Sequence, residues 1–241
     1  MLYHLLVPLA KDHIVFNVFR YLTFRFLLAL ISALVISLVI GPFIIRRLRR
    51  LQHGGNTIRE DTPARHLAKQ GTPTMGGLVI LGALLGSTLL WANLRNRYVW
   101  VVVAATVGFA LIGALDDLGK LRHHKGLSAR TKLGLQLLLT LGVLQAVYWQ
   151  PPASGWAPVL AIPFLKGWLI DLGPLWIPFA MMVIIGASNA VNLTDGLDGL
   201  AIGPVMINAG TYLVWAYIAG LILFGRPIAQ YLDIPGIVEM G

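Results

Sequence analysis

The run FRFLLALISALVISLVIGPFII, residues 24–45, decides the fold class of this chain. Arg25 is its only charged residue, and as a helix the run would extend about 33 Å, enough to cross a hydrocarbon core of about 30 Å. Of all 241 residues, 57% are hydrophobic and 12% are charged, which is about half the charged fraction of a soluble domain. We therefore expect an all-α, polytopic membrane protein.

Five further apolar runs have the length of membrane-spanning helices, at residues 75–94, 98–115, 133–149, 175–191 and 200–224. Residues 1–23 mix apolar, aromatic and basic side chains, and we expect them to lie along the membrane interface. Residues 151–175 are rich in Pro, Gly and Trp, and we expect a small periplasmic hairpin on the membrane surface there. The six spans predict a single integral membrane domain covering residues 1–241.

The basic residues are distributed unevenly between the two sides of these spans. Twelve of the 19 Lys and Arg residues fall in segments 46–74 and 116–132, which lie on the same side as segment 192–199. The positive-inside rule places this side in the cytoplasm and the N-terminus in the periplasm. The net charge of +9 is therefore a topology signal, and we expect no nucleic-acid partner. The topology puts four aspartates on one membrane face: Asp116, Asp117, Asp195 and Asp198.

Two polar motifs flank the spans on that face. Asp116-Asp117 follows the third span, where each carboxylate is disfavoured by roughly 0.3–1 kcal/mol at a helix C-terminus, so a nearby lysine or a bound metal would stabilise the pair. The motif NLTDGLDG, residues 192–199, offers the hard oxygen ligands that Mg²⁺ prefers. Simpler interpretations remain open, namely a solvated acidic pair and two Asp-Gly turns in which Asp198 caps a helix.

The segment KQGTPTMGG, residues 69–77, leads into the second span. Lys69, Thr72 and Thr74, with backbone N–H groups at a helix start, form a candidate phosphate site; the alternative is that Thr74 is simply an N-cap. The chain has no Walker A, HExxH or GxSxG motif, which argues against an NTPase, a zinc protease and an α/β-hydrolase. It has no cysteine, which excludes disulfides and thiolate chemistry.

Three segments resemble one family in order and spacing over nearly the whole chain. They are GTPTMGG at residues 71–77, Asp116-Asp117 followed by KGLSARTKL at 125–133, and NAVNLTDGLDGLA at 189–201. The chain is similar to the phospho-N-acetylmuramoyl-pentapeptide transferases (the MraY family) among the polyprenyl-phosphate N-acetylhexosamine-1-phosphate transferases. The resemblance implies transfer of phospho-N-acetylmuramoyl-pentapeptide from its UDP carrier to undecaprenyl phosphate, with Mg²⁺, giving lipid I and UMP for peptidoglycan synthesis at the bacterial inner membrane.

The resemblance also implies roles for single residues. The catalytic acidic pair of the family is matched by Asp116 and Asp117. Basic positions near the phosphates are matched by Lys120, Lys125 and Lys132. Positions near the metal and the pyrophosphate are matched by Asn192 and Asp195. The uridine pocket is matched by Lys69, Gly196, Leu197 and Asp198.

The charge of the lipid substrate bears on what the acidic pair does. A phosphate monoester has a second pKa of about 6, so the lipid phosphate is already largely a nucleophilic dianion near pH 7. Removal of a proton from the lipid phosphate by an aspartate would therefore add little to the rate. We therefore expect Asp116 and Asp117 to act mainly by positioning the metal and the lysines.

Family members continue beyond the length of this chain, with further spans, a later acidic motif and a histidine cluster. Because that acidic motif supplies a principal metal ligand, the C-terminal third is expected to be missing and the isolated 241-residue chain to be inactive. Three alternatives remain open: a sister transferase for another UDP-N-acetylhexosamine, a membrane transporter, and a scaffold that binds a protein partner or an inhibitor. Family members often dimerise, so the resemblance implies a homodimer among membrane lipids.

Overall fold

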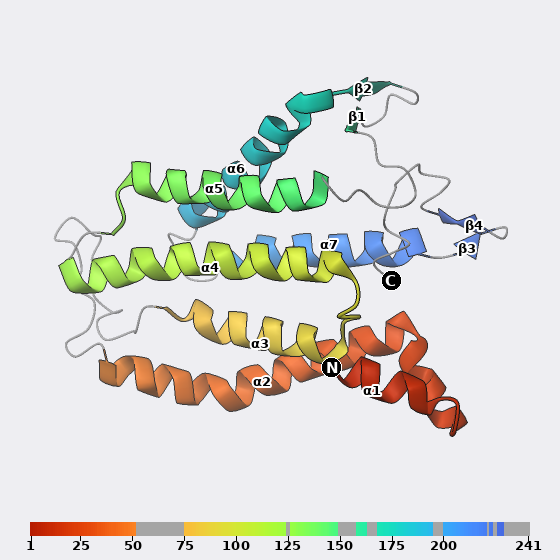
Figure 1. Ribbon diagram of the computed structural model, residues 1–241. Coiled ribbons are helices and arrows are strands. Elements are labelled where there is room, and N and C mark those ends of the chain that lie inside the picture. Colours follow the sequence, from red (N-terminus) through yellow and green to blue (C-terminus); the bar gives the residue numbers. More distant parts are fainter. Residues whose placement is uncertain are drawn as a thin grey trace. The chain divides into compact units, whose positions relative to one another are not determined.

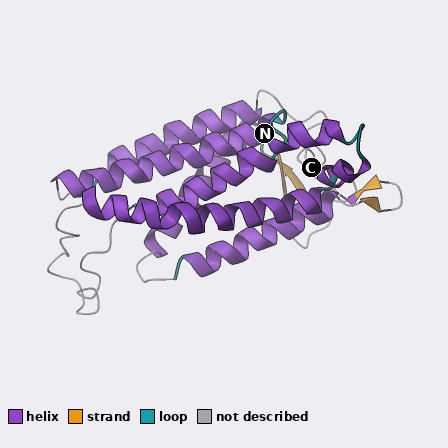
Figure 2. Ribbon diagram, turned by 90° about the horizontal axis from the view of Figure 1, so that it is seen from below, coloured by secondary structure: helices purple, strands orange, loops and turns teal. Residues whose placement is uncertain are grey.

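Helices make up most of the described chain, and the strands are short (Figure 2). The computed structural model describes residues 1–51, 75–123, 126–148, 158–162, 168–194, 200–220, 222–223 and 226–228. The chain divides into two compact units, Met1–Leu135 and Gln136–Gly241.

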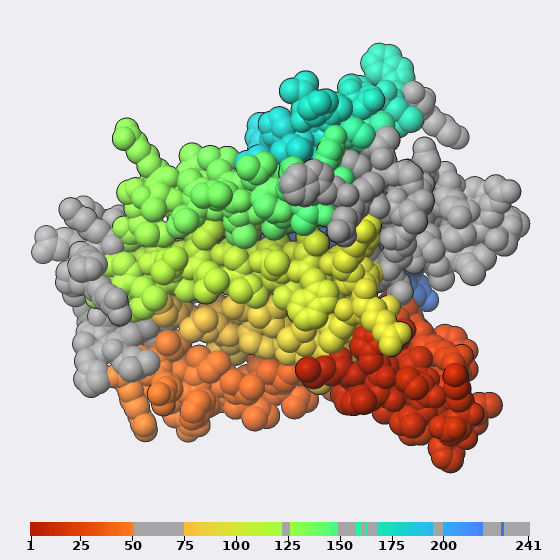
Figure 3. Space-filling view, in the orientation of Figure 1, coloured from red at the N-terminus to blue at the C-terminus, as the bar shows by residue number. Residues whose placement is uncertain are grey.

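The first unit consists of an N-terminal segment and three long helices (Figure 1). The N-terminal segment contains α1 (Leu2–Leu9) and a 3-10 helix, Ile14–Arg20. It leads into α2 (Leu22–Leu51), along which α3 (Gly77–Trp91) packs, and α4 (Arg97–His123) lies against α3. The N-terminal segment, red in Figure 3, gathers at the end of this unit where α2 begins and α3 ends.

Small residues allow α2 and α3 to approach each other closely. A Cβ added at Gly86 of α3 would lie 3.1 Å from Ile36 Cδ1, and one added at Gly41 of α2 would lie 3.4 Å from Val79 Cγ1. Ala83, one turn before Gly86, is buried. Close backbone approach through small residues is a general way for helices to associate in a membrane, where lipid removes most of the hydrophobic driving force.

The second unit combines helices with two short hairpins. α5 begins in the first unit and continues into the second, and the elements that follow are β1, β2, a 3-10 turn, α6, α7, β3 and β4. Their bounds are Ala129–Tyr148 for α5, Val159–Ala161 for β1, Leu169–Asp171 for β2, Gly173–Leu175 for the turn, Trp176–Thr194 for α6, Ile202–Gly220 for α7, Ile222–Leu223 for β3 and Arg226–Pro227 for β4. Both strand pairs are antiparallel, with Leu160 opposite Ile170 in the first. The hairpin expected within residues 151–175 is therefore present.

Four helical segments are long and apolar enough to cross a membrane: Leu22–Arg50, Arg97–Leu121, Ala129–Tyr148 and Gly173–Thr194. Two shorter apolar helices are Gly77–Trp91 and Ile202–Ile218. Among the described residues only five apolar side chains are buried, while many large ones are exposed, as is expected where lipid rather than a protein core covers them. The chain is an all-α, multi-pass membrane protein, and the number of six spans stays a prediction.

Candidate active site

The acidic pair Asp116-Asp117 lies inside α4 and not at its end. We expected the helix to end with the apolar run at residue 115, but α4 continues to His123. This extension places Lys120 four residues after Asp116 and three after Asp117, spacings at which side chains on a helix are neighbours. The cation that stabilises the pair is therefore a lysine of the same helix, and the prediction that the pair closes the helix is wrong.

Lys120 contacts both carboxylates. Its Nζ lies 2.8 Å from Asp116 Oδ2 and 3.1 Å from Asp117 Oδ1. The side chain of Lys120 is 54% exposed, that of Asp117 33% and that of Asp116 13%. Exposed ion pairs contribute only about 0–1 kcal/mol to stability, so the significance of this cluster lies in its charge balance and geometry.

Asp116 is also bound by the connection between α4 and α5. Its Oδ1 accepts a hydrogen bond from the backbone N–H of Leu127 at 2.8 Å. Gly126 lies so close that an added Cβ would overlap Asp116 Oδ1 and would lie 3.1 Å from Lys120 Cε. Both carboxylate oxygens of Asp116 therefore have partners, one from the backbone and one from Lys120.

The same connection begins α5. Ser128 Oγ accepts a hydrogen bond from the backbone N–H of Thr131 at 3.1 Å, and the Ser128 carbonyl accepts one from Lys132 N–H at 2.9 Å. This is the arrangement of a helix N-cap, in which a serine hydroxyl satisfies an N–H group of the first turn. Lys132 lies in this turn, so its backbone is held by a connection that is itself bonded to Asp116.

The two aspartates differ in what they still offer to a ligand. Asp116 is largely buried and both of its oxygens are engaged. Asp117 is more exposed, and within the part of the chain that the structure describes its Oδ2 has no hydrogen-bond partner. Asp117 is thus the carboxylate that can meet a cation or a phosphate-bound metal directly, while Asp116 orients its neighbours.

A polar pair, with Gln136 buried and Asn189 partly exposed, lies in the second unit. Asn189 Nδ2 of α6 donates hydrogen bonds to Gln136 Oε1 of α5 and to the Ile185 carbonyl, both at 2.9 Å. Gln136 is 3% exposed, and a buried amide is costly unless it is hydrogen-bonded. Asn192 follows Asn189 by three residues and is exposed near the end of α6. Sequence reasoning missed Gln136, although an amide within a leucine-rich span is a signal of its own.

The structure describes five of the predicted site residues: Asp116, Asp117, Lys120, Lys132 and Asn192. The other seven lie outside the described residues: Lys69, Thr74, Lys125, Asp195, Gly196, Leu197 and Asp198. The N-cap of α3 is Gly76, so the alternative interpretation of Thr74 as the N-cap of this helix is wrong. The first unit brings Asp116, Asp117 and Lys120 into contact and ties the start of α5 to them.

The donor atoms of these residues suit a hard divalent cation. Among the described residues, no group of three His, Asp or Glu side chains could hold a metal. Mg²⁺, however, commonly binds through one or two protein oxygens and completes its shell with water and substrate phosphates. Asp117 in the first unit and Asn192 in the second each offer a side-chain oxygen of that kind.

Comparison with known proteins places this cluster within a family. The family model of glycosyl transferase family 4 matches residues 99–229, and the phospho-N-acetylmuramoyl-pentapeptide-transferase signature 1 matches residues 69–81. The first match contains Asp116, Asp117, Lys120 and Asn192. The second contains Lys69 and Thr74.

Curated relatives match the chain over its whole length. Proteins named phospho-N-acetylmuramoyl-pentapeptide-transferase are 50% identical over 243 residues in Citrifermentans bemidjiense, 51% over 244 residues in Desulfatibacillum aliphaticivorans and 45% over 260 residues in Anaeromyxobacter sp.. The chain spans 66% of the length of the first two relatives and 68% of the third.

Proposed function

The chain belongs to glycosyl transferase family 4, among the phospho-N-acetylmuramoyl-pentapeptide-transferases, and from this premise we propose that the natural protein makes lipid I. The donor is UDP-N-acetylmuramoyl-pentapeptide and the acceptor is undecaprenyl phosphate. The products are lipid I and UMP. The reaction would take place at the cytoplasmic face of the bacterial inner membrane, the orientation that the positive-inside rule favours.

The observation that carries the proposal is the carboxylate pair bridged by Lys120 within a basic segment. Both substrates are phosphates, so their approach brings several negative charges together. Lys120 lies 2.8 and 3.1 Å from the two carboxylates and is exposed, so it can exchange one carboxylate for a substrate phosphate. Lys132, in the first turn of α5, adds a second cation to the same segment.

The reaction itself needs no group that accepts a proton. A dianionic oxygen of undecaprenyl phosphate attacks the phosphorus that bears the sugar, and the anhydride bond to the uridine phosphate breaks. UMP leaves with the bridging oxygen. The protein contributes alignment of two anions and stabilisation of the charge on the transferred and leaving groups. Asp117 beside Lys120 fits this role better than that of a general base.

Mg²⁺, when bound, would polarise the pyrophosphate and neutralise the leaving UMP. We propose Asn192 and Asp195 as the residues that hold it. Lys69, Gly196, Leu197 and Asp198 are proposed to bind the uridine, and Lys125 and Thr74 the phosphates. Thr74 is assigned from its place at the start of the second span and the other residues from the family resemblance, and a homodimer of the natural protein is a further prediction.

The test is a direct assay of product. The natural full-length protein, purified in detergent, is incubated with both substrates, and lipid I is detected by mass spectrometry with Mg²⁺ or with a chelator. We expect lipid I only with Mg²⁺. If the full-length protein forms no lipid I from these substrates, the proposed function is wrong.

The same assay separates the alternatives. Product formed only from another UDP-N-acetylhexosamine would identify a sister transferase. Transport of substrate without chemical conversion would identify a transporter, for which ionisable residues near the middle of the spans are expected. Within the described part of the chain, Asp116 and Asp117 instead lie near the end of α4, Asp12 in the turn after α1 and Asp171 at the end of β2, which favours chemistry at the membrane surface.

A further inference from the structure

We propose that Gly126 is a positioning residue for the transfer reaction. It acts through Asp116, because a side chain at residue 126 would occupy the space of the Asp116 carboxylate. This inference rests on the proposed function for its catalytic consequence. The contact itself is geometric and can be tested separately.

The space around Gly126 differs from that around three glycines of α4 and α5, namely Gly113, Gly134 and Gly142. An added Cβ would overlap Asp116 Oδ1 and approach Lys120 Cε to 3.1 Å. At Gly113, Gly134 and Gly142 an added Cβ would meet nothing within 4 Å. Glycine is thus required at residue 126 by its neighbours, while the other three positions have room for a methyl group.

The backbone conformation at Gly126 does not by itself require glycine. Among the described residues the glycine with a positive φ is Gly173, at 47°, so Gly126 lies in a region open to alanine. Substitution by alanine therefore tests one thing, the contact with Asp116. This separates Gly126 from glycines that are needed for a left-handed turn.

The close approach at Gly126 has three consequences for the cluster. It lets Leu127 N–H reach Asp116 Oδ1 at 2.8 Å, which occupies one oxygen. It leaves Oδ2 as the oxygen that holds Lys120, at 2.8 Å. It also fixes the connection that ends in Ser128, the N-cap of α5. One small residue thereby sets the position of Lys120 and of the start of α5.

Asp117 gains its role from this arrangement. Because Asp116 is held on both oxygens, Lys120 is anchored on one side and presents its remaining donors towards Asp117, 3.1 Å away. A displaced Asp116 would carry Lys120 with it and misalign the cation with the substrate phosphates. Misplacement of about 1 Å in such a constellation can cost about 100-fold in rate.

The experiment compares Gly126→Ala with Gly134→Ala in the natural full-length protein. We expect Gly126→Ala to lower kcat for lipid I formation about 100-fold, with the KM for the UDP donor unchanged because its uridine contacts lie elsewhere. Gly134→Ala, at a glycine with open space, should match the wild type. Equal kcat in the two variants would overturn the proposal.

A double-mutant cycle with Asp116→Ala tests whether the effect passes through the carboxylate. Removing the carboxylate makes room for a Cβ, so Gly126→Ala should cost little in the Asp116→Ala background, in kcat and in the midpoint of thermal unfolding. Costs that add independently would overturn the proposal. If the wild type forms no lipid I, the proposed function fails, and the unfolding midpoints alone decide whether residues 116 and 126 are coupled.

Discussion

The two ends of the first unit compensate positive charge in opposite ways. Near the end of α4, Lys120 lies between two carboxylates and is exposed. At the start of α2, Arg25 is 8% exposed and its guanidinium lies 4.5 Å from the centre of the Tyr3 ring. Its Nε has no hydrogen-bond partner in the described part of the chain. We call these the acidic end and the aromatic end.

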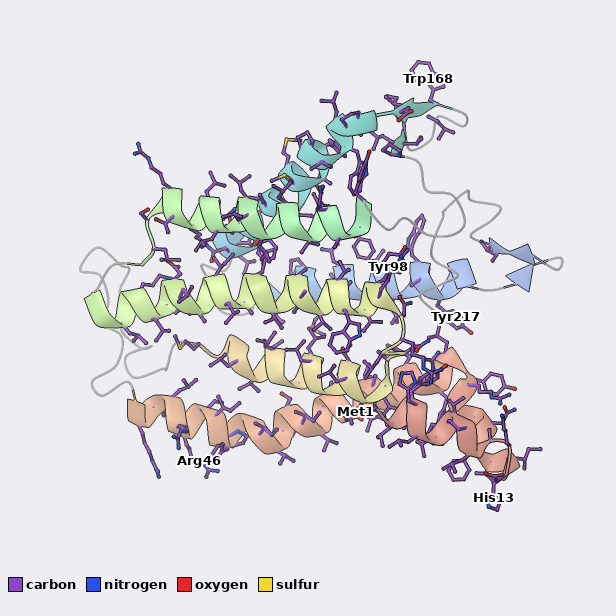
Figure 4. All side chains as sticks on the ribbon, in the orientation of Figure 1. Met1, His13, Arg46, Tyr98, Trp168 and Tyr217 are labelled. Atoms are coloured by element: carbon purple, nitrogen blue, oxygen red, sulfur yellow. The ribbon has the colours of Figure 1, made fainter. Side chains whose placement is uncertain are left out.

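The aromatic end is held together by hydrogen bonds and ring contacts. The amino group of Met1 donates hydrogen bonds to the carbonyls of Leu89 and, at 3.2 Å, of Leu90, which places the N-terminus beside the end of α3 (Figure 4). The rings of Phe19 and Trp91 stack with centroids 6.1 Å apart, and Trp91 Nε1 donates to Ser32 Oγ at 2.9 Å. These contacts join the N-terminal segment to α2 and α3.

The two ends use a cation at a membrane for different purposes. Lys120 is accessible, and its partners are two carboxylates, either of which a substrate phosphate could replace. Arg25 is enclosed, and its partner is a ring that no substrate would displace. Substitutions at the acidic end should therefore change turnover, and substitutions at the aromatic end should change stability.

The largest effect is expected at Asp117. Asp117→Asn keeps the size of the side chain but removes the charge of the more accessible carboxylate, so kcat for lipid I formation should fall about 100- to 1000-fold. Asp12→Asn, at an exposed aspartate of the N-terminal segment, is the control and should leave kcat unchanged. A variant that binds metal normally and loses turnover only below about pH 6 would instead assign Asp117 the role of general base.

The next effect is expected at Lys120. Lys120→Met leaves two neighbouring carboxylates without their shared cation, so they repel each other and the incoming phosphates, and kcat/KM should fall about 10- to 100-fold. The unfolding midpoint should hardly change, because exposed ion pairs contribute only about 0–1 kcal/mol. Lys11→Met in the exposed turn after α1 is the control. A lower midpoint with normal turnover would contradict the division between the ends.

The fold and part of the acidic end could be predicted from sequence. Apolar runs predict helices in lipid because every backbone polar group must be satisfied within its own segment. The sequence did not show that α4 continues to His123, because the turn after Asp117 contains Gly119 and the charged Lys120. The turn is stabilised by the contacts of Lys120 with the two aspartates, which composition does not reveal. The contact of Gly126 with Asp116 was missed because it depends on how the chain returns after the helix.

The Gln136–Asn189 hydrogen bond shows the same limit in the second unit. The two residues are 53 positions apart, and each on its own is only a polar residue in an apolar run. A sequence can mark such residues as needing a partner in a membrane. It cannot name the partner, because that depends on the rotation of both helices about their axes.

At the aromatic end, Tyr3→Leu should lower the free energy of unfolding by about 0.5–2 kcal/mol. The substitution removes the ring beside Arg25 and leaves a buried guanidinium with one partner fewer. Tyr21→Leu, at a side chain that is 60% exposed, is the matched control. Thermal unfolding in detergent measures the difference, and kcat should be unchanged in both variants. Loss of turnover in Tyr3→Leu at normal stability would mean that the aromatic end takes part in the reaction.

The smallest effect is a dependence of stability on pH through His4. Burial lowers the pKa of His4, and the charges of Arg95 and of the N-terminal amino group lower it further. His4 Nε2 accepts a hydrogen bond from Leu94 N–H at 3.0 Å, which only an unprotonated nitrogen can do. The folded protein therefore binds this proton less readily than the unfolded chain.

A pKa that is lower in the folded state gives stability that is complete above the ordinary histidine value of about 6.5 and is lost as the pH falls below it. His4→Gln replaces the ring with an amide oxygen that can accept from Leu94 N–H and does not titrate. The unfolding midpoint of the wild type should drop more between about pH 7.5 and pH 5.5 than that of His4→Gln. His13→Gln, at an exposed histidine of the same segment, should keep the wild-type difference. Equal drops in all three proteins would show that the aromatic end is held by its rings and by Arg25, without a contribution from the His4 hydrogen bond.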